Sequence, residues 1–184
     1  PSHLTDILDD NRPDDELSPA EQKERFIVKL LFQLKDGTVF QRKKTLTFLI
    51  NQAPNFPSDV LFGRMFEFLQ SHALTQLERH TFIKALDRLM YRLHNSILTF
   101  APSIVDFAGS LVNDRDQLAK SEAREVLAHL TKIIGMFPLL KLVRPKLGQP
   151  EAPQIIASAV GAVGISSVIQ FLRACSATQK PEIR

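Results

Sequence analysis

The chain has 184 residues, of which 44% are hydrophobic and 23% are charged, and this balance is typical of a folded globular domain. Its longest uncharged apolar run, residues 155–171, contains Ser, Gly and Gln and is shorter than the roughly 20 apolar residues that a membrane span needs. A single cysteine, Cys175, excludes an internal disulfide, and the first residues show neither a basic start nor an apolar stretch. These features predict a reducing compartment, either cytosol or nucleus.

The net charge of +3 conceals an uneven distribution. Residues 1–18 contain six acidic residues and one arginine, a balance of −5, so the remainder of the chain carries +8. A basic body suits a polyanionic partner, and an acidic segment could shield the basic surface or dock on another protein. The simpler alternative is a solvated tail, and residues 1–17 are expected to form an acidic, flexible arm.

The first strong helix signal follows this arm. Ser18 suits the N-cap, Pro19 suits the first helical position, and Glu21 completes a capping box. Apolar residues then recur at helical spacing, namely Ile27, Leu30, Leu31 and Leu34. Gly37 is expected to end the helix in a left-handed conformation, so the sequence predicts a first helix over residues 18–37.

Four pairs of amphipathic helices are expected to follow within residues 38–184. The repeats are predicted at 38–71, 74–112, 115–147 and 150–175. Turns between the paired helices are expected near Pro54 to Pro57, His94 to Ser96, Gly135 to Pro138 and Gly164 to Ser167, with Pro102 near the start of its helix. The first three turns are about 40 residues apart, the period of HEAT repeats, and apolar residues almost never alternate as they do in strands. The predicted fold is an all-α HEAT-repeat solenoid, part of a longer array.

Catalytic and cofactor chemistry is not expected. The histidines are scattered without metal-ligand spacing, at His3, His72, His80, His94 and His129. No HExxH, Cys-x-x-Cys or Walker loop occurs, and Gly161 to Gly164 lacks the strand and the Lys-Ser/Thr that a nucleotide loop needs. The sequence predicts a surface for binding and no enzyme, metal site or cofactor.

Basic residues form the most informative chemical pattern. The clearest group is Lys84, Arg88 and Arg92, which recur every four positions and therefore share one face of a helix. Further candidates for contact with RNA or a partner are Arg42, Lys43, Lys44, Lys120, Arg124, Lys141, Arg144 and Lys146. Together they could form a basic band that binds phosphates without sequence choice. The alternative is a set of ordinary solvated helix faces, partly paired with neighbouring acids.

Several blocks of residues resemble one known family. They are Leu17 to Arg25, Lys29 to Leu31, Lys35 to Thr38, Gln76 to His80, Asp87 to Leu93, Glu122 to Glu125, Arg144 to Pro145 and Gly164 to Leu172. In this order they are similar to the beginning of the HEAT array of the splicing factor 3B subunit 1 family. The likeness covers about residues 17–175. Between Arg144 and Gly164 the chain is shorter than the family pattern, and Glu151 to Gln154 replaces an expected basic helix start.

The resemblance implies a nuclear HEAT-repeat scaffold of the U2 small nuclear ribonucleoprotein that helps to clamp the duplex of U2 RNA and the intron branch site. The implied partners are U2 RNA, the pre-mRNA intron, spliceosomal RNA helicases and other splicing factor 3B subunits. Among these subunits are an RNA-recognition-motif protein, a PHD-finger-like zinc protein and a propeller protein. The alternative function is a HEAT adaptor that binds only proteins, of the transport-receptor or phosphatase-scaffold type.

Overall fold

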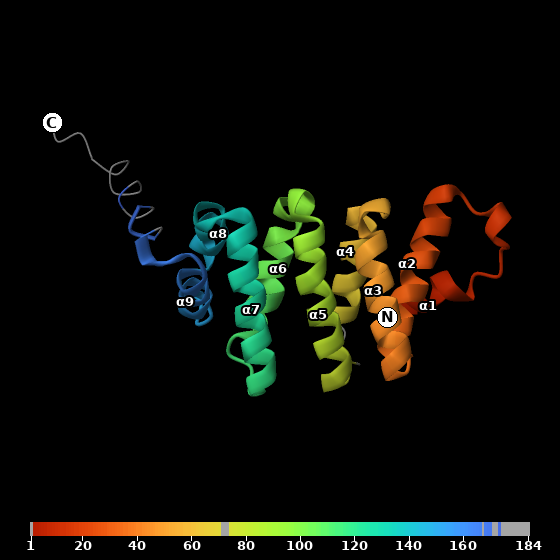
Figure 1. Ribbon diagram of the computed structural model, residues 1–184, viewed down its shortest axis with the longest axis horizontal. Coiled ribbons are helices and arrows are strands. Elements are labelled where there is room, and N and C mark those ends of the chain that lie inside the picture. The colour runs from red at the N-terminus through yellow and green to blue at the C-terminus, as the bar shows by residue number, and fades with distance from the viewer. Residues whose placement is uncertain (1, 71–73, 167, 171–172, 174–184) are drawn as a thin grey trace. The chain divides into compact units, whose positions relative to one another are not determined.

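The computed structural model describes residues 2–70, 74–166, 168–170 and 173. In these residues every regular element is a helix, as the ribbon in Figure 1 shows. The chain divides into two compact units, Pro1–Ser96 and Ile97–Arg184. The boundary falls inside the second predicted repeat, because helix α5 (Gln76–Arg92) belongs to the first unit and helix α6 (Ile97–Leu111) to the second.

The first unit is built around two long helices. Its helices are α1 (Ser2–Asp9), α2 (Pro19–Asp36), α3 (Val39–Gln52), α4 (Ser58–Leu69) and α5 (Gln76–Arg92), with 3₁₀ turns at Asp14–Glu16, Ala53–Asn55 and His94–Ser96. Helix α2 packs against α1, α3, α4 and α5, and α5 also packs against α3 and α4. The core contains fully buried Leu34, Leu49, Phe62, Phe82 and Leu86. Burial of these side chains is the main force that holds the helices together.

Reciprocal capping boxes fix three helix starts in this unit. At α2 the Ser18 hydroxyl accepts from the Glu21 amide at 3.3 Å, and the Glu21 carboxylate accepts from the Ser18 amide at 2.8 Å. The start predicted from the sequence is therefore confirmed. Thr38 caps α3 and Thr75 caps α5 in the same way. Each box satisfies backbone donors that no helical carbonyl can reach.

The N-terminal segment differs from the expected flexible arm. Residues Ser2–Asp9 form helix α1, which packs on α2, and both Leu4 and Leu17 are buried. Arg25 of α2, only 7% exposed, donates to the backbone carbonyls of Arg12 and Asp10, each at 2.9 Å. These contacts could not be predicted from composition. The segment is mostly acidic, which suggests a solvated arm, but a few buried residues hold it against α2.

This attachment is expected to weaken in acid. Hydrogen bonds from Arg12 lower the pKa of Asp10 from 3.8 to about 2, and hydrogen bonds with Ser18 and then Arg12 lower that of Glu21 from 4.5 to about 2. A carboxylate with a depressed folded-state pKa stabilises the fold above its unfolded pKa and loses that contribution as protons bind. The stabilisation should be complete above pH 4.5 and decline toward pH 2. NMR amide exchange of residues 4–17, measured across this range, should show the segment loosening.

The matched variant for this experiment is Arg12→Gln. It removes the guanidinium that contacts both Asp10 and Glu21, so the segment should be looser already at pH 5 and its opening should depend less on pH than in the unchanged chain. The quantity to compare is the protection factor of each amide, which is corrected for the intrinsic pH dependence of exchange. Protection factors that are the same at pH 5 and pH 2.5 in both proteins would contradict the assignment.

Gly37 ends α2 for a reason that the sequence did not reveal. Its backbone is extended (φ −69°, ψ 158°) and not left-handed, which corrects the expectation. A Cβ at this position would lie 2.3 Å from the Gln33 carbonyl oxygen, so the residue must be small because the backbone passes close by.

Two glycine substitutions should therefore have opposite effects. Gly37→Ala should lower the free energy of unfolding by about 1–3 kcal/mol, because the end of α2 must shift. Gly63→Ala should raise it by about 0.5–1 kcal/mol, because Gly63 is inside helix α4 and, apart from its chain neighbours and the nearby backbone of its own helix, no atom of the described residues lies within 4 Å of its would-be Cβ. Urea denaturation followed by circular dichroism measures both changes. Equal effects of the two substitutions would refute the steric argument.

The second unit contains α6 (Ile97–Leu111), α7 (Gln117–Ile134), α8 (Met136–Val143) and α9 (Ala152–Val163), with a 3₁₀ turn at Arg144–Lys146. Helix α7 packs against α6, α8 and most extensively α9, and α8 also packs against α6 and α9. Gly135 separates α7 from α8 with φ 85°, a backbone conformation that favours glycine. Pro102 lies inside α6, not near its start, because the helix begins directly after the preceding 3₁₀ turn.

The helical pairs confirm the all-α HEAT-type architecture. The predicted turns near residues 54, 94 and 135 coincide with observed breaks between α3 and α4, α5 and α6, and α7 and α8. Half of the second helix expected in the repeat 150–175 lies outside the described residues, as does Ser167 of the last predicted turn. The numerical repeat boundaries themselves stay predictions.

Candidate nucleic-acid interface

The candidate basic residues divide between the two units. The first unit carries Arg42, Lys43, Lys44, Lys84, Arg88 and Arg92. The second carries Lys120, Arg124, Lys141, Arg144 and Lys146. A single band across all eleven residues stays a prediction.

Helix α5 presents the most open of these surfaces. Its apolar face buries Phe82, Ile83, Leu86, Leu89 and Met90 in the core of the first unit. The spacing of four then leaves Lys84, Arg88 and Arg92 exposed to solvent, about 6 Å apart along the axis. Among the described residues, none of these three cations forms an ion pair. Such charges are available to a polyanion without first breaking an internal contact. These three residues are called the α5 stripe below.

The cations at the start of α3 have different roles. Arg42 is half-buried and donates from Nη2 to the Lys35 carbonyl at the end of α2, while its buried Nε has no hydrogen-bond partner in the part of the chain that the structure describes. A guanidinium at a helix C-terminus satisfies a carbonyl that the helix leaves free. Arg42 therefore contributes to packing, whereas Lys43 and Lys44 are exposed.

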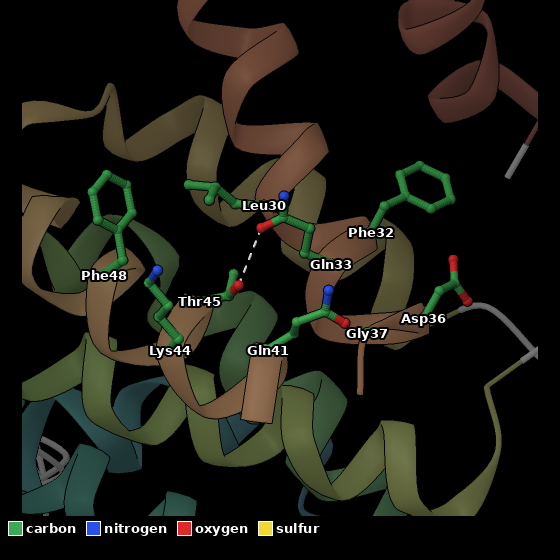
Figure 2. Close-up of a pocket in the computed structure, with 9 residues that line it drawn as sticks. All are labelled: Leu30, Phe32, Gln33, Asp36, Gly37, Gln41, Lys44, Thr45 and Phe48. Atoms are coloured by element: carbon green, nitrogen blue, oxygen red, sulfur yellow. Dashed lines mark hydrogen bonds between the residues drawn. The ribbon is translucent and has the colours of Figure 1, made fainter. Parts of the chain in front are cut away.

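Lys44 borders a hollow of about 560 Å³ between α2 and α3. Figure 2 shows Phe32 and Asp36 on one side of it and Lys44 and Phe48 on the other, with Thr45 hydrogen-bonded to Gln33 between them. The Thr45 hydroxyl donates to Gln33 Oε1 at 3.1 Å. Because an acid and a base both line this hollow, its electrostatics do not favour an anion.

A second hollow, of about 410 Å³, lies between α3 and α5. It is lined by Thr47, Ile50, Asn51, Arg88, Tyr91 and Arg92. Among the described residues, no carboxylate lines it, and two residues of the α5 stripe do. It is called the α3–α5 groove below. The groove is therefore positively charged, which suits an anionic ligand and disfavours a cation.

Some basic candidates of the second unit already contact other side chains. Lys146 forms an ion pair with Asp106 at 2.6 Å, and the Lys141 ammonium lies 4.4 Å from the centre of the Phe137 ring. Arg124 lines a hollow between α7 and α9 together with Glu125. Lys120 is half-buried and Arg144 is exposed. Two of the five candidates in this unit, Lys141 and Lys146, therefore already contact another side chain, whereas no member of the α5 stripe forms an ion pair with a described residue.

Two arginines that sequence reasoning did not select are structural. Arg64 of α4 joins Glu24 of α2 and Glu67 of its own helix. Although partial burial opposes the charged form, these carboxylates raise the pKa of Arg64 above its usual value. Arg25 anchors the N-terminal segment, as described above. An i, i+3 spacing could have suggested Arg64 with Glu67, but no sequence signal points across 40 residues to Glu24.

Two features of other functional classes are absent from the described residues. Across residues 2–70 and 74–166, and the few described beyond them, no three His, Cys, Asp or Glu side chains come together in a way that could hold a metal ion. Within the same residues, no helix has both the length and the apolar character of a membrane span.

No protein-family model matches the chain. Curated proteins do match it, and two of them align over most of its length. The U2 snRNP component prp10 of Schizosaccharomyces pombe is 31% identical over 173 aligned residues, 89% of this chain and 14% of the relative. The U2 snRNP component HSH155 of Saccharomyces cerevisiae is 27% identical over 184 aligned residues, 97% of this chain and 19% of the relative. The chain thus spans less than a fifth of the length of either protein.

These matches agree with the resemblance carried by the separate residue blocks. They extend that resemblance to nearly the whole chain, and the helical structure agrees with the HEAT repeats that the resemblance implies. The chain is a divergent homologue of these two U2 snRNP components and corresponds to a segment of the splicing factor 3B subunit 1 family.

Proposed function

We propose that this chain is a segment of a pre-mRNA splicing factor and serves as part of the HEAT-repeat scaffold of the splicing factor 3B complex in the U2 snRNP. The observation that carries the proposal is the similarity to two U2 snRNP components over 89% and 97% of the chain. Helical repeats present large surfaces and seldom carry reactions themselves, which suits a scaffold and not an enzyme.

Within this scaffold, the α5 stripe is the surface proposed to face RNA. The exposure of Lys84, Arg88 and Arg92, and their lack of ion pairs with described residues, support this assignment. Contacts to phosphates would supply affinity and position without reading sequence. In the intact protein, such contacts would help to clamp the duplex of U2 RNA and the intron branch site.

The remaining surfaces are proposed to dock proteins. The partners are those that the family resemblance implies: the RNA-recognition-motif, PHD-finger-like and propeller subunits of splicing factor 3B, and spliceosomal RNA helicases. The exposed apolar side chains Val39 and Phe40, 80% and 77% exposed at the start of α3, would suit a protein partner. The proposed location is the nucleus.

A tagged pull-down of the full-length protein from nuclear extract of its own organism tests the proposal. Bound RNA is sequenced and bound proteins are identified by mass spectrometry at two salt concentrations. Recovery of U2 RNA with the splicing factor 3B subunits is expected. Recovery of transport or phosphatase components without U2 RNA would instead favour the protein-only adaptor.

A further inference from the structure

We propose that the α3–α5 groove binds one unpaired nucleotide of a single-stranded RNA. This inference rests on the proposed RNA-facing role of the α5 stripe and names the form of RNA that the site takes. The groove has the three properties that such a ligand requires: positive charge, an aromatic surface and polar groups that can reach a base edge.

The charge comes from α5. Arg88 and Arg92 are four residues apart, so they lie on the same face of the helix, and both line the groove. Both are exposed, and neither forms an ion pair with a described residue. A guanidinium matches the geometry of a phosphate with two parallel hydrogen bonds. The groove therefore offers a site for one phosphate, or for two neighbouring phosphates of one strand.

The aromatic surface comes from Tyr91, which lines the same groove between the two arginines in sequence. It is 50% exposed although most apolar residues of α5 are buried. Ile50 of α3 adds an apolar surface on the other side. Proteins that hold single-stranded RNA stack bases on such exposed aromatic rings, because every base has a flat apolar face.

Polar groups of α3 complete the site. Asn51 carries an amide donor and an amide acceptor, the pair that a base edge needs. The Thr47 hydroxyl donates to the Lys43 carbonyl at 3.0 Å, so its oxygen stays available as an acceptor. Together with Tyr91, these groups suit a ligand that is both planar and polar, such as a nucleotide base.

The size and lining of the groove favour a nucleotide over other anionic ligands. A volume of about 410 Å³ lies in the range of small-ligand sites and is far too small for a duplex. An acidic peptide would use the arginines but would gain little from an exposed tyrosine beside an asparagine. The hollow between α2 and α3 is larger, yet Asp36 and Lys44 line it together, so it lacks the charge for a phosphate.

The test uses the whole 184-residue chain and a ten-nucleotide oligouridine that carries 5-iodouridine. Irradiation should attach the RNA to Tyr91, as located by mass spectrometry. Tyr91→Leu keeps apolar bulk but removes the ring, and it should weaken binding of the single strand about tenfold while leaving duplex binding unchanged. Phe40→Leu, at an aromatic residue outside the groove, is the matched control and should bind RNA normally.

Charge is tested separately with Arg88→Gln. This change should weaken binding and lower the log–log salt slope for the single strand by about 0.7, the contribution of one phosphate contact. Lys29→Gln, at an exposed cation of α2, is its control. Circular dichroism confirms that each variant keeps its helix content.

The outcomes separate the groove from the wider proposal. If Arg88→Gln weakens binding but Tyr91→Leu does not, and no crosslink reaches Tyr91, the groove holds no base and only the general RNA-facing role survives. If a ten-residue oligoglutamate competes as well as the RNA and is insensitive to Tyr91→Leu, the ligand is an acidic peptide and the inference is wrong. If no RNA binds even at low salt, both the inference and the RNA-facing role of the α5 stripe are overturned.

Discussion

Replacing Lys84, Arg88 and Arg92 together by alanine is expected to remove most RNA binding by the chain. The three side chains are exposed and lie on one face of α5, so each can neutralise one phosphate. Each lost contact lowers the slope of log affinity against log salt by about 0.7 for single strands and about 0.9 for duplex. The slope should therefore fall by roughly 2 to 3, as measured by fluorescence anisotropy between 50 and 200 mM salt, an interval over which such contacts dominate affinity.

The control for this variant must change the net charge equally. Lys23, Lys29 and Lys132 are also exposed and form no ion pair with a described residue, and they lie on α2 and α7. Replacing these three by alanine lowers the net charge by the same amount without touching α5. If both triple variants lose affinity equally, RNA responds only to total charge, and the assignment of the α5 stripe fails.

Removing one aromatic ring from the core of the first unit is expected to have the largest effect on stability. Phe82 is fully buried on α5 and stacks on Phe68 of α4, with ring centroids 5.1 Å apart and planes at 20°. Phe82→Ala removes this burial and leaves a cavity, which typically lowers the free energy of unfolding by about 3–5 kcal/mol. Because whole domains have only about 5–15 kcal/mol, this loss should be visible as a large shift in the urea midpoint.

The same substitution connects stability with function. Phe82 lies on the buried face of the helix whose opposite face carries the α5 stripe, so loosening α5 should also weaken RNA binding near physiological temperature. Phe40→Ala is the matched control, because Phe40 is 77% exposed and its loss should change stability by no more than about 0.5 kcal/mol. Equal destabilisation by the two alanine variants would mean that the packing of Phe82 is not what holds α5.

The candidate site was predictable in part. The spacing of Lys84, Arg88 and Arg92 placed them on one helix face, and the structure leaves all three exposed. The same reasoning treated Arg42 and Lys146 as equivalent candidates, yet Arg42 donates to the end of α2 and Lys146 pairs with Asp106. Helix periodicity shows which residues share a face, but it does not show which neighbouring helix covers that face.

The amino-acid sequence alone determined the local features of this protein. The capping box at Ser18 and the apolar spacing of α5 depend on residues three or four positions apart, so they can be read directly from the chain. Tertiary structure decided the rest. It brought Arg64 to Glu24 across 40 residues, buried Arg25 beneath an N-terminal segment expected to be flexible, and placed Tyr91 and Arg88 in the same groove as Asn51. Whether a charge becomes an anchor or an exposed contact depends on desolvation and on partners supplied by distant segments, and only the folded packing defines these.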